Sequence, residues 1–452
     1  MAMQMARAAT TGSGRLRRRR LHQRHPPRRR RRHLRPRPLV NRAARARHAV
    51  IACLVGIPLY VAACAVPDGG LFRAARFRDV HLYQRYTEAL LNGHVPYRDF
   101  FMEYPPGALA VFVPPAAATS AHYNAAFKAL MALCGVAALV CVSVVLVRLD
   151  ASIGRLWAAV LLVALSPAAL GPISLNTYDA WPALLTVAAL AAILLHRDVL
   201  ALGLLGLAFA AKVYPVVLLP LALVWTWRTR GRRTALAGLA AFATVALFVV
   251  SPFLILAPHG LLESFRSQAA RGLQIESLGA QVLVFADQIG VYSVTVAHHT
   301  RGAVTYDLQG TLPGAFGAVS SALQVVAVLV VAWLYARRRD HGTRLVTAFA
   351  AAVAGFLAFS RFFSPQYLVW LVPLVVLVDS IAVWALLAVA LVLDQVWFFH
   401  YQSIVELGDR SWFVLARDLL VVALFALLLR REATKDEDAV LLEDEPPLRV
   451  PP

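Results

Sequence analysis

Residues 77–107 read FRDVHLYQRYTEALLNGHVPYRDFFMEYPPG, and they form the first long polar interruption in a chain that is otherwise largely apolar. Hydrophobic residues make up 59% of the 452 residues and charged residues only 15%, which is less charge than a water-soluble protein carries. Apolar stretches of nearly 20 residues recur around this segment, as they do in transmembrane helices. Runs rich in Leu, Ala and Val satisfy their own backbone polar groups as helices. The sequence therefore predicts an all-α polytopic membrane protein.

The body of the chain, residues 48–430, is expected to hold about 10–12 transmembrane helices. They are predicted near residues 49–66, 123–147, 157–175, 180–195, 199–211, 213–227, 235–256, 314–335, 345–359, 367–378, 381–399 and 413–429. Only Lys212 separates the pair at 199–227, which is either two short helices or one kinked helix. The apolar piece at 108–118 is broken by Pro114 and Pro115, and we expect it not to cross the membrane.

The two ends of the chain are polar tails. Residues 1–47 contain 17 arginines and no acid, and we interpret them as a disordered cytoplasmic tail that fixes the topology by the positive-inside rule. Contact with nucleic acid or anionic lipid is the alternative reading of this tail. Residues 431–452 are acidic and tipped with proline, which predicts a second disordered cytoplasmic tail. The remainder is close to neutral, so the net charge of +20 gives the body of the protein no nucleic-acid function.

Topology gathers the polar sites on one face. With residues 1–47 inside, residues 67–107 form the first extracytoplasmic loop and 258–313 a second extracytoplasmic segment. The basic clusters at 228–233 and 337–339 are then cytoplasmic. If 108–118 does not span, residues 176–179, Lys212 and 361–367 also lie outside; if it does span, the middle of the chain is inverted unless 199–227 is a single helix.

Two acids of the first loop are the strongest catalytic candidates. Asp79 lies about twelve residues beyond the first predicted helix, where a carboxylate can act as general base on a hydroxyl. Simple pairing with Arg76, Arg78 or Arg85 explains it equally well. Glu103 precedes Tyr104-Pro105-Pro106-Gly107, where the chain re-enters the membrane and a carboxylate is costly unless it is paired or functional. Asp99 and Glu88 are interpreted as solvated or arginine-paired charges.

Other polar residues could bind a substrate. Asn176 and Asp179 lie between two apolar runs, where they either cap a helix or line a site. Lys212 is a lone cation between apolar helices, so it is either functional or snorkels to the interface. Arginine binds phosphate through paired donors, which favours Arg271 and Arg361 as phosphate ligands. The remaining candidates for substrate binding are His81, Tyr83, Tyr104, Glu276 and Gln366.

We expect neither a metal nor a cofactor. The nearest approach to a metal cluster is His298, His299 and Asp307, whose spacing is not specific. The four cysteines all lie in apolar segments and have no metal or disulfide spacing. A phosphate-cradling GxxxxGK[ST] loop, a dinucleotide fingerprint and an HExxH pair are all missing from the sequence.

The order of five motifs resembles a known family. DVHLYxxYxxALLNGHVPYRDFxxEYPPGAL is followed by LNTYDAWPALL, GLLGLAFAAKVYPVVLLP, RGLQIESLGA and RFFSPQYLVWLVPL. This order resembles the polyprenyl-phosphate-sugar-dependent glycosyltransferases of the GT-C superfamily over about residues 50–425. The nearest group is bacterial family 87, which includes mycobacterial-type α-1,2-mannosyltransferases acting on phosphatidylinositol mannosides. The catalytic subunit of GPI mannosyltransferase I is a more distant likeness.

The resemblance implies an inverting transfer of mannose from a polyprenyl phosphate at the outer face of a bacterial plasma membrane. It implies that Asp79 is the catalytic base and that the acceptor is a lipid or a cell-envelope glycan. Eukaryotic relatives carry a D-x-D pair at this place, whereas this chain has Asp79-Val80-His81, which makes metal dependence doubtful and leaves His81 as an auxiliary. A lipid-glycan transporter without covalent chemistry and an inactive member kept as a scaffold are the alternative hypotheses.

Overall fold

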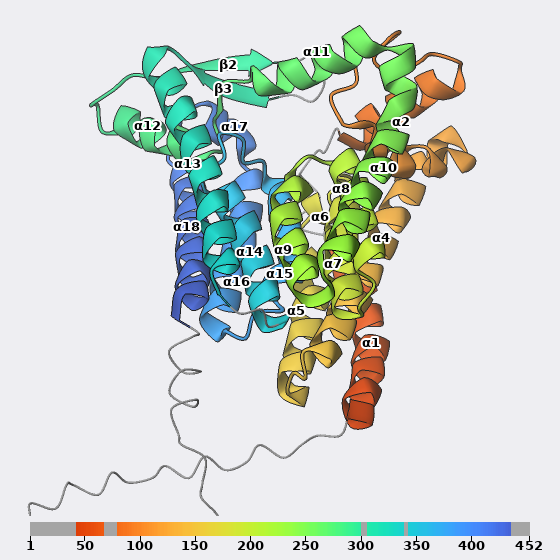
Figure 1. Ribbon diagram of the computed structural model, residues 1–452. Helices are drawn as coiled ribbons and strands as arrows, with labels where there is room; N and C mark the ends of the chain where they lie inside the picture. The colour runs from red at the N-terminus through yellow and green to blue at the C-terminus, as the bar shows by residue number, and fades with distance from the viewer. Residues whose placement is uncertain (1–41, 67–78, 300–304, 339–341, 435–452) are drawn as a thin grey trace, which may run out of the picture. The chain divides into compact units, whose positions relative to one another are not determined.

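The computed structural model describes residues 42–66, 79–299, 305–338 and 342–434. Most of the arginine-rich tail, the acidic tail after residue 434, and Arg76 and Arg78 lie outside these residues. Within them the protein is helical, with one small sheet (Figure 1). The expected all-α polytopic architecture is confirmed.

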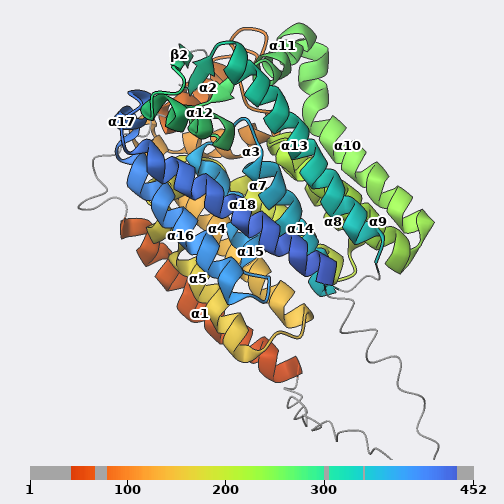
Figure 2. The same cartoon turned by 90° about the vertical axis from the view of Figure 1, so that its left-hand side faces the viewer.

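Seven helices in the described part of the chain are long and apolar enough to cross a membrane. They are α1 (Arg42–Ala65), α4 (Tyr123–Arg148), α5 (Ile153–Leu170), α10 (Arg232–Leu256), α13 (Thr311–Ala336), α16 (Ile381–Phe398) and α18 (Ser411–Thr434). Figure 2 shows α1, α5, α16 and α18 side by side, each packed on the next. The outer faces of α10 and α13 expose apolar side chains such as Phe248 and Leu329, as helices that face lipid do.

Shorter apolar helices account for the difference between these seven and the predicted 10–12. The chief ones are α7 (Ala180–Leu194), α8 (Asp198–Ala211), α9 (Leu219–Arg230), α14 (Gly342–Ala358) and α15 (Val372–Val375). Helix α14 is buried at every residue from Arg344 to Gly355, and its alanines allow the neighbouring helices to approach closely. The piece at 108–118 forms only short turns, within η3 (Pro106–Ala108), α3 (Leu109–Phe112) and η4 (Pro114–Ala117).

The stretch 199–227 contains two separate helices. Lys212 has an extended backbone and ends α8, and the 3₁₀ turn η6 (Tyr214–Leu218), with Pro215 near its start, leads into α9. Asp198, which begins α8, lies 3.5 Å from Arg230, which ends α9 (Oδ2 to Nε). The two helices are therefore antiparallel, and Lys212 lies at the opposite end from this ion pair.

The basic clusters gather at that ion-paired end, which we call the basic end. Arg228 donates to the backbone oxygens of Ala336 and Arg338, and Arg148 donates to Leu194 O at 3.0 Å. A buried ion pair joins Arg344 Nη2 and Glu432 Oε2 at 3.0 Å. These bonds join the ends of α4 and α7, of α9 and α13, and of α14 and α18.

Short elements form the other end, which we call the site end. They are α2 (Asp79–Leu91), η5 (Ser120–His122), α6 (Ile173–Asn176), α11 (Pro258–Ala269), β1 (Leu273–Gln274), α12 (Leu278–Gln288), β2 (Thr295–His299), β3 (Thr305–Gln309), η7 (Pro365–Trp370) and α17 (Tyr401–Val405). The strands are antiparallel in the order β1-β3-β2, with Leu308 paired to both Leu273 and Val296. A second hydrophobic core that includes Leu283, Leu308 and Trp397 fastens this sheet and α12 to the helices below.

Candidate active site

Asp79 begins helix α2 at the site end. Val80 and Tyr83 anchor this helix because both are buried, and the Asp79 side chain itself is partly buried. Burial, reinforced by the charges of Glu103 and Asp179, raises the pKa of Asp79 to about 7, and Lys212 opposes this rise. Asp79 is therefore a carboxylate that accepts a proton near neutral pH, as a general base should.

Glu103 lies in a tightly folded part of the first loop. The turn before it is made by Tyr97, whose φ of 68° is left-handed, and the Tyr97 hydroxyl donates to Tyr104 O at 2.6 Å. Glu103 is buried, and its Oε2 lies 3.8 Å from Arg271 Nη2. The sequence segments around 103 and 271 therefore meet, although 168 residues separate the two side chains.

Asp99 and Glu88 are surface charges, as the sequence predicted. The Arg98 guanidinium, 3.0 Å from Asp99, and a hydrogen bond from the Val95 amide lower the pKa of Asp99 to about 2. Glu88 is exposed and accepts from Gln84 at 2.9 Å. Neither carboxylate has the partly desolvated character of Asp79.

Asp179 and Lys212 form a buried ion pair that brings two separate motifs together. The Trp370 indole donates to Asp179 Oδ1 at 2.7 Å, and the Lys212 ammonium lies 4.5 Å from the centre of the Tyr178 ring and 4.9 Å from that of Tyr367. Aromatic faces and a carboxylate stabilise a desolvated ammonium. Asp179 precedes α7 but makes no capping hydrogen bond, so the capping alternative does not describe it.

Aromatic side chains form a cluster beside this pair, because the Tyr178 ring that contacts Lys212 also meets Tyr83 and Tyr104. Tyr83 stacks on Phe112 with ring centres 4.2 Å apart, and it meets the edges of Tyr104 and Tyr178 at 5.5 and 5.8 Å. Tyr83 and Tyr178 are almost fully buried. The two tyrosines predicted at positions 83 and 104 thus belong to the cluster, and Tyr178 is an addition to it.

Arg271 and Arg361 both lie near the ring of Phe362, with guanidinium carbons 5.6 and 5.3 Å from its ring centre. Arg271 donates to Gln268 Oε1 at 3.0 Å and to Thr305 Oγ1 at 3.3 Å. Arg361 donates to Ala269 O, at the end of α11, so part of its donor capacity serves the fold. Of the two arginines, Arg271 is the one that contacts Glu103.

Three further sequence candidates have other surroundings. His81 is exposed on α2, and a residue two positions after Asp79 lies on the other side of a helix. Asn176 donates to Pro172 O at 2.8 Å within its own turn. Gln366 is partly buried in η7. No group of three His, Cys, Asp or Glu side chains that could hold a metal ion is found among the residues with described positions.

Glu276, a predicted binding residue, belongs to a second buried polar cluster. The sequence reasoning missed the other charged members of this cluster. Glu276 accepts from the Tyr401 hydroxyl at 2.7 Å, and burial raises its pKa to about 7. Arg417 donates to Glu276 O at 2.8 Å and lies 3.2 Å from Asp394 and 2.9 Å from Asp418. Charged residues inside the apolar runs LVLDQVWF and FVLARDLLVV were the signal for it, because such residues are costly in a membrane.

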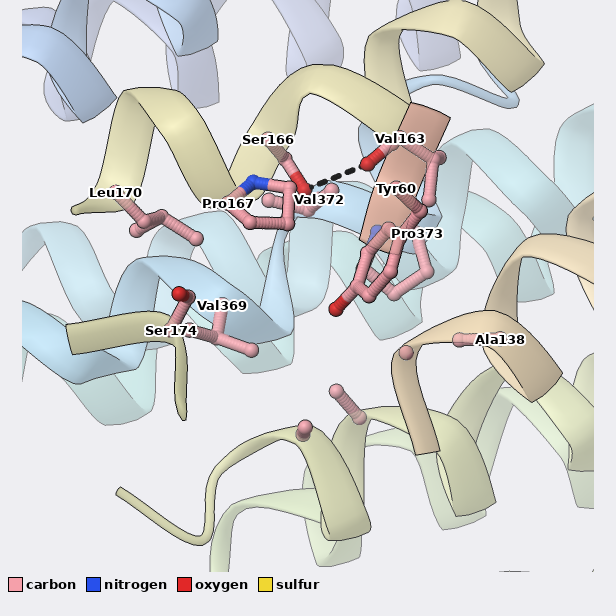
Figure 3. A pocket seen from close by; sticks show the side chains of 13 residues that line it. Tyr60, Ala138, Val163, Ser166, Pro167, Leu170, Ser174, Val369, Val372 and Pro373 are labelled. Carbon is pink, nitrogen blue, oxygen red and sulfur yellow. Dashed lines mark hydrogen bonds between the residues drawn. The ribbon is translucent and has the colours of Figure 1, made fainter. Parts of the chain in front are cut away.

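An apolar pocket lies between the helices (Figure 3). Ala180, next to Asp179, and Val369, next to Trp370, are among its lining residues, which come from α1, α4, α5, α6, α7, η7 and α15 and include no charged side chain. Its serine hydroxyls already donate to the protein: Ser166 to Val163 O and Ser174 to Gly171 O, both at 2.8 Å. The pocket therefore suits hydrocarbon better than a polar group.

Comparison with known proteins gives one family. The sequence model of glycosyltransferase family 87 matches residues 101–365, more than half of the chain. The matched stretch contains Glu103, Asp179, Lys212, Arg271 and Arg361, and Asp79 precedes it. The match confirms the resemblance predicted from the five motifs. Comparison with curated proteins found no match.

Proposed function

Because the chain belongs to glycosyltransferase family 87, we propose that this membrane glycosyltransferase moves a hexose, mannose by our reading, from a polyprenyl phosphate to a lipid or cell-envelope glycan. The observation that carries the proposal is the setting of Asp79. Its pKa is raised to about 7 by burial and by Glu103 and Asp179, with Lys212 close enough to act on it. A base and cations for a departing phosphate are what this transfer requires.

In the proposed step, Asp79 removes the proton from the acceptor hydroxyl as the oxygen attacks the anomeric carbon. The bond between that carbon and the phosphate oxygen breaks, and its electron pair remains on the polyprenyl phosphate. The attack from the opposite side inverts the configuration. Asp79 then passes its proton to water, so the products are the glycosylated acceptor and polyprenyl phosphate.

Arg271 and Lys212 hold the departing phosphate in this proposal, with Arg361 at the edge of the site. Both side chains already face carboxylates, Glu103 and Asp179, so a bound phosphate would share them with these acids. Tyr104, the partly exposed tyrosine of the aromatic cluster, packs against the sugar in this proposal. The pocket of Figure 3 supports a lipid-linked donor, because its uncharged lining begins one residue from Asp179.

The orientation is also a proposal. Arg228 and Arg230 lie at the basic end and Lys212 at the opposite one, and positively charged segments stay in the cytoplasm. The site end then faces outward from a bacterial plasma membrane. The arginines of residues 42–47, at the start of α1, agree with a cytoplasmic N-terminus.

The proposal is tested by transfer from radiolabelled polyprenyl-phosphate-mannose with purified protein in detergent. Asp79→Asn should lower kcat by at least about 100-fold, the usual contribution of a general base. The exposed Glu88→Gln, on the same helix, is the matched control and should behave as the wild type. Near-normal transfer by a folded Asp79→Asn protein would remove Asp79 from the reaction. Lack of transfer by the wild type in detergent, with lipid movement in vesicles, would favour the transporter.

A further inference from the structure

Helix α11 faces the Glu103 segment along one stripe. Gly260, Ser264 and Gln268 recur every four residues and therefore share one side of the helix; we call them the α11 stripe. The Ser264 hydroxyl donates to Met102 O at 2.7 Å, and the Gln268 amide donates to Glu103 O at 3.5 Å. A Cβ atom on Gly260 would lie only 1.7 Å from Tyr97 O, so glycine is needed for this approach.

The peptide under the stripe has a conformation that needs support. Tyr97 is left-handed, which is unfavourable for a residue with a side chain and persists where the surroundings fix it. Ser264 is 4% exposed and Met102 is fully buried. The Met102 carbonyl therefore cannot bond to water in place of the Ser264 hydroxyl. Loss of that hydroxyl would leave the carbonyl as a buried acceptor without a donor.

These two hydrogen bonds hold the backbone at Met102 and at Glu103, and Glu103 is an acid whose charge acts on Asp79. Glu103, Asp179 and Lys212 are the charges that shift the pKa of Asp79. Of these three residues, Glu103 is the one whose backbone the α11 stripe contacts. Arg271, just beyond α11, contacts the Glu103 side chain. Residues of the second polar segment thus contact both the backbone of Glu103, through Gln268, and its side chain, through Arg271.

We infer that Ser264 and Gln268 are positioning residues of the sugar transfer, which act by fixing the peptide that carries Glu103. The inference rests on the proposed role of Asp79 as base. It makes the segment from 258 to 271 part of the catalytic apparatus, although neither positioning residue touches Asp79 or the reacting atoms.

The test compares two serines of the same helix. Ser264→Ala removes the bond to Met102, whereas Ser267→Ala removes only a bond to Ser264 O, at 2.8 Å within α11. We expect Ser264→Ala to lower kcat about tenfold, the effect of one buried hydrogen bond, with little change in the donor KM. Gln268→Ala should act in the same direction but less, and Ser267→Ala should resemble the wild type.

The pH profile separates positioning from general stability. The negative charge of Glu103 raises the pKa of Asp79, so displacing Glu103 lowers that pKa. The acid limb of kcat/KM should therefore move to lower pH in Ser264→Ala, as it should in Glu103→Gln. A lower kcat with an unmoved limb would assign Ser264 a purely structural role and overturn the inference.

Hydrogen exchange provides a readout that needs no sugar transfer. Local opening of residues 97–104 should be faster in Ser264→Ala than in Ser267→Ala. Equal exchange in both variants would contradict the inference and leave the proposed function untouched. Conversely, full transfer by Asp79→Asn would remove Asp79 as the base, and with it the catalytic meaning of any difference in exchange.

Discussion

Arg271 Nη2 lies 3.8 Å from Glu103 Oε2, and this contact joins the first polar loop to the second polar segment of the chain. Both side chains are more than three-quarters buried, so the interaction is less screened than a surface ion pair. Two functions are consistent with this place for Arg271. It either orients Glu103 or, as we propose, also binds the departing phosphate.

A double-mutant cycle separates these functions. In the proposed mechanism Arg271→Ala raises the donor KM about tenfold, in line with a charge-assisted bond to phosphate, and it does so in the Glu103→Gln background as well. The measurement is the donor KM of the two single variants and the double variant. If Arg271 acts only through Glu103, the double variant will be no worse than Glu103→Gln alone. Arg266→Ala, exposed on α11, is the control for loss of positive charge.

The rate should depend on pH through Asp79. Its pKa is raised to about 7, and a base works only when deprotonated, so kcat/KM should fall about tenfold per pH unit below about pH 7 and level off above it. The residual activity of Asp79→Asn should lack this limb. An acid limb near pH 4, the ordinary range of an aspartate, would show that the carboxyl is not perturbed in the working enzyme.

Lys212 and Asp179 should be strongly coupled in stability. Their side chains are only 12% and 1% exposed, and removal of one partner from a buried pair costs roughly 3–5 kcal/mol. Lys212→Met should therefore lower the free energy of unfolding, measured by denaturation in detergent, by about that amount. The double variant Asp179→Asn/Lys212→Met should recover part of the loss, and the exposed Arg233→Met should change little. A loss in the double variant equal to the sum of the two single losses would argue against the pair.

Arg417 should be needed for the fold of the site end. It is fully buried and contacts Asp394, Asp418 and the Glu276 carbonyl. Arg417→Met leaves these groups without their cation, and we expect unfolding to become easier by roughly 3–5 kcal/mol. The measurement is thermal unfolding with Arg410→Met, an exposed neighbour in sequence, as the control. A wild-type melting temperature for Arg417→Met would contradict this role.

Much of the architecture could be predicted from the sequence because the length of an apolar segment is a local property. A run such as 123–147 has to be a helix in a membrane wherever its neighbours lie, and α4 spans Tyr123–Arg148. The motif order was equally local, and it sufficed for the family. The basic clusters that begin at Arg228 and Arg337 were expected on one side, and Arg228 contacts Arg338 O.

The partners of the charged residues were decided only by the tertiary structure. From the sequence, capping was an alternative for Asp179 and snorkelling one for Lys212. The neighbouring residues of either side chain do not reveal that its partner lies 33 positions away. Likewise no spacing rule connects Arg417 with Asp394, or Ser264 with Met102. These contacts form because the antiparallel return of α8 and α9 and the crossing of α11 bring distant segments to one end. The pairing of buried charges depends on how the helices are arranged in space. The need to remove the apolar helices from water, in contrast, follows from their composition alone.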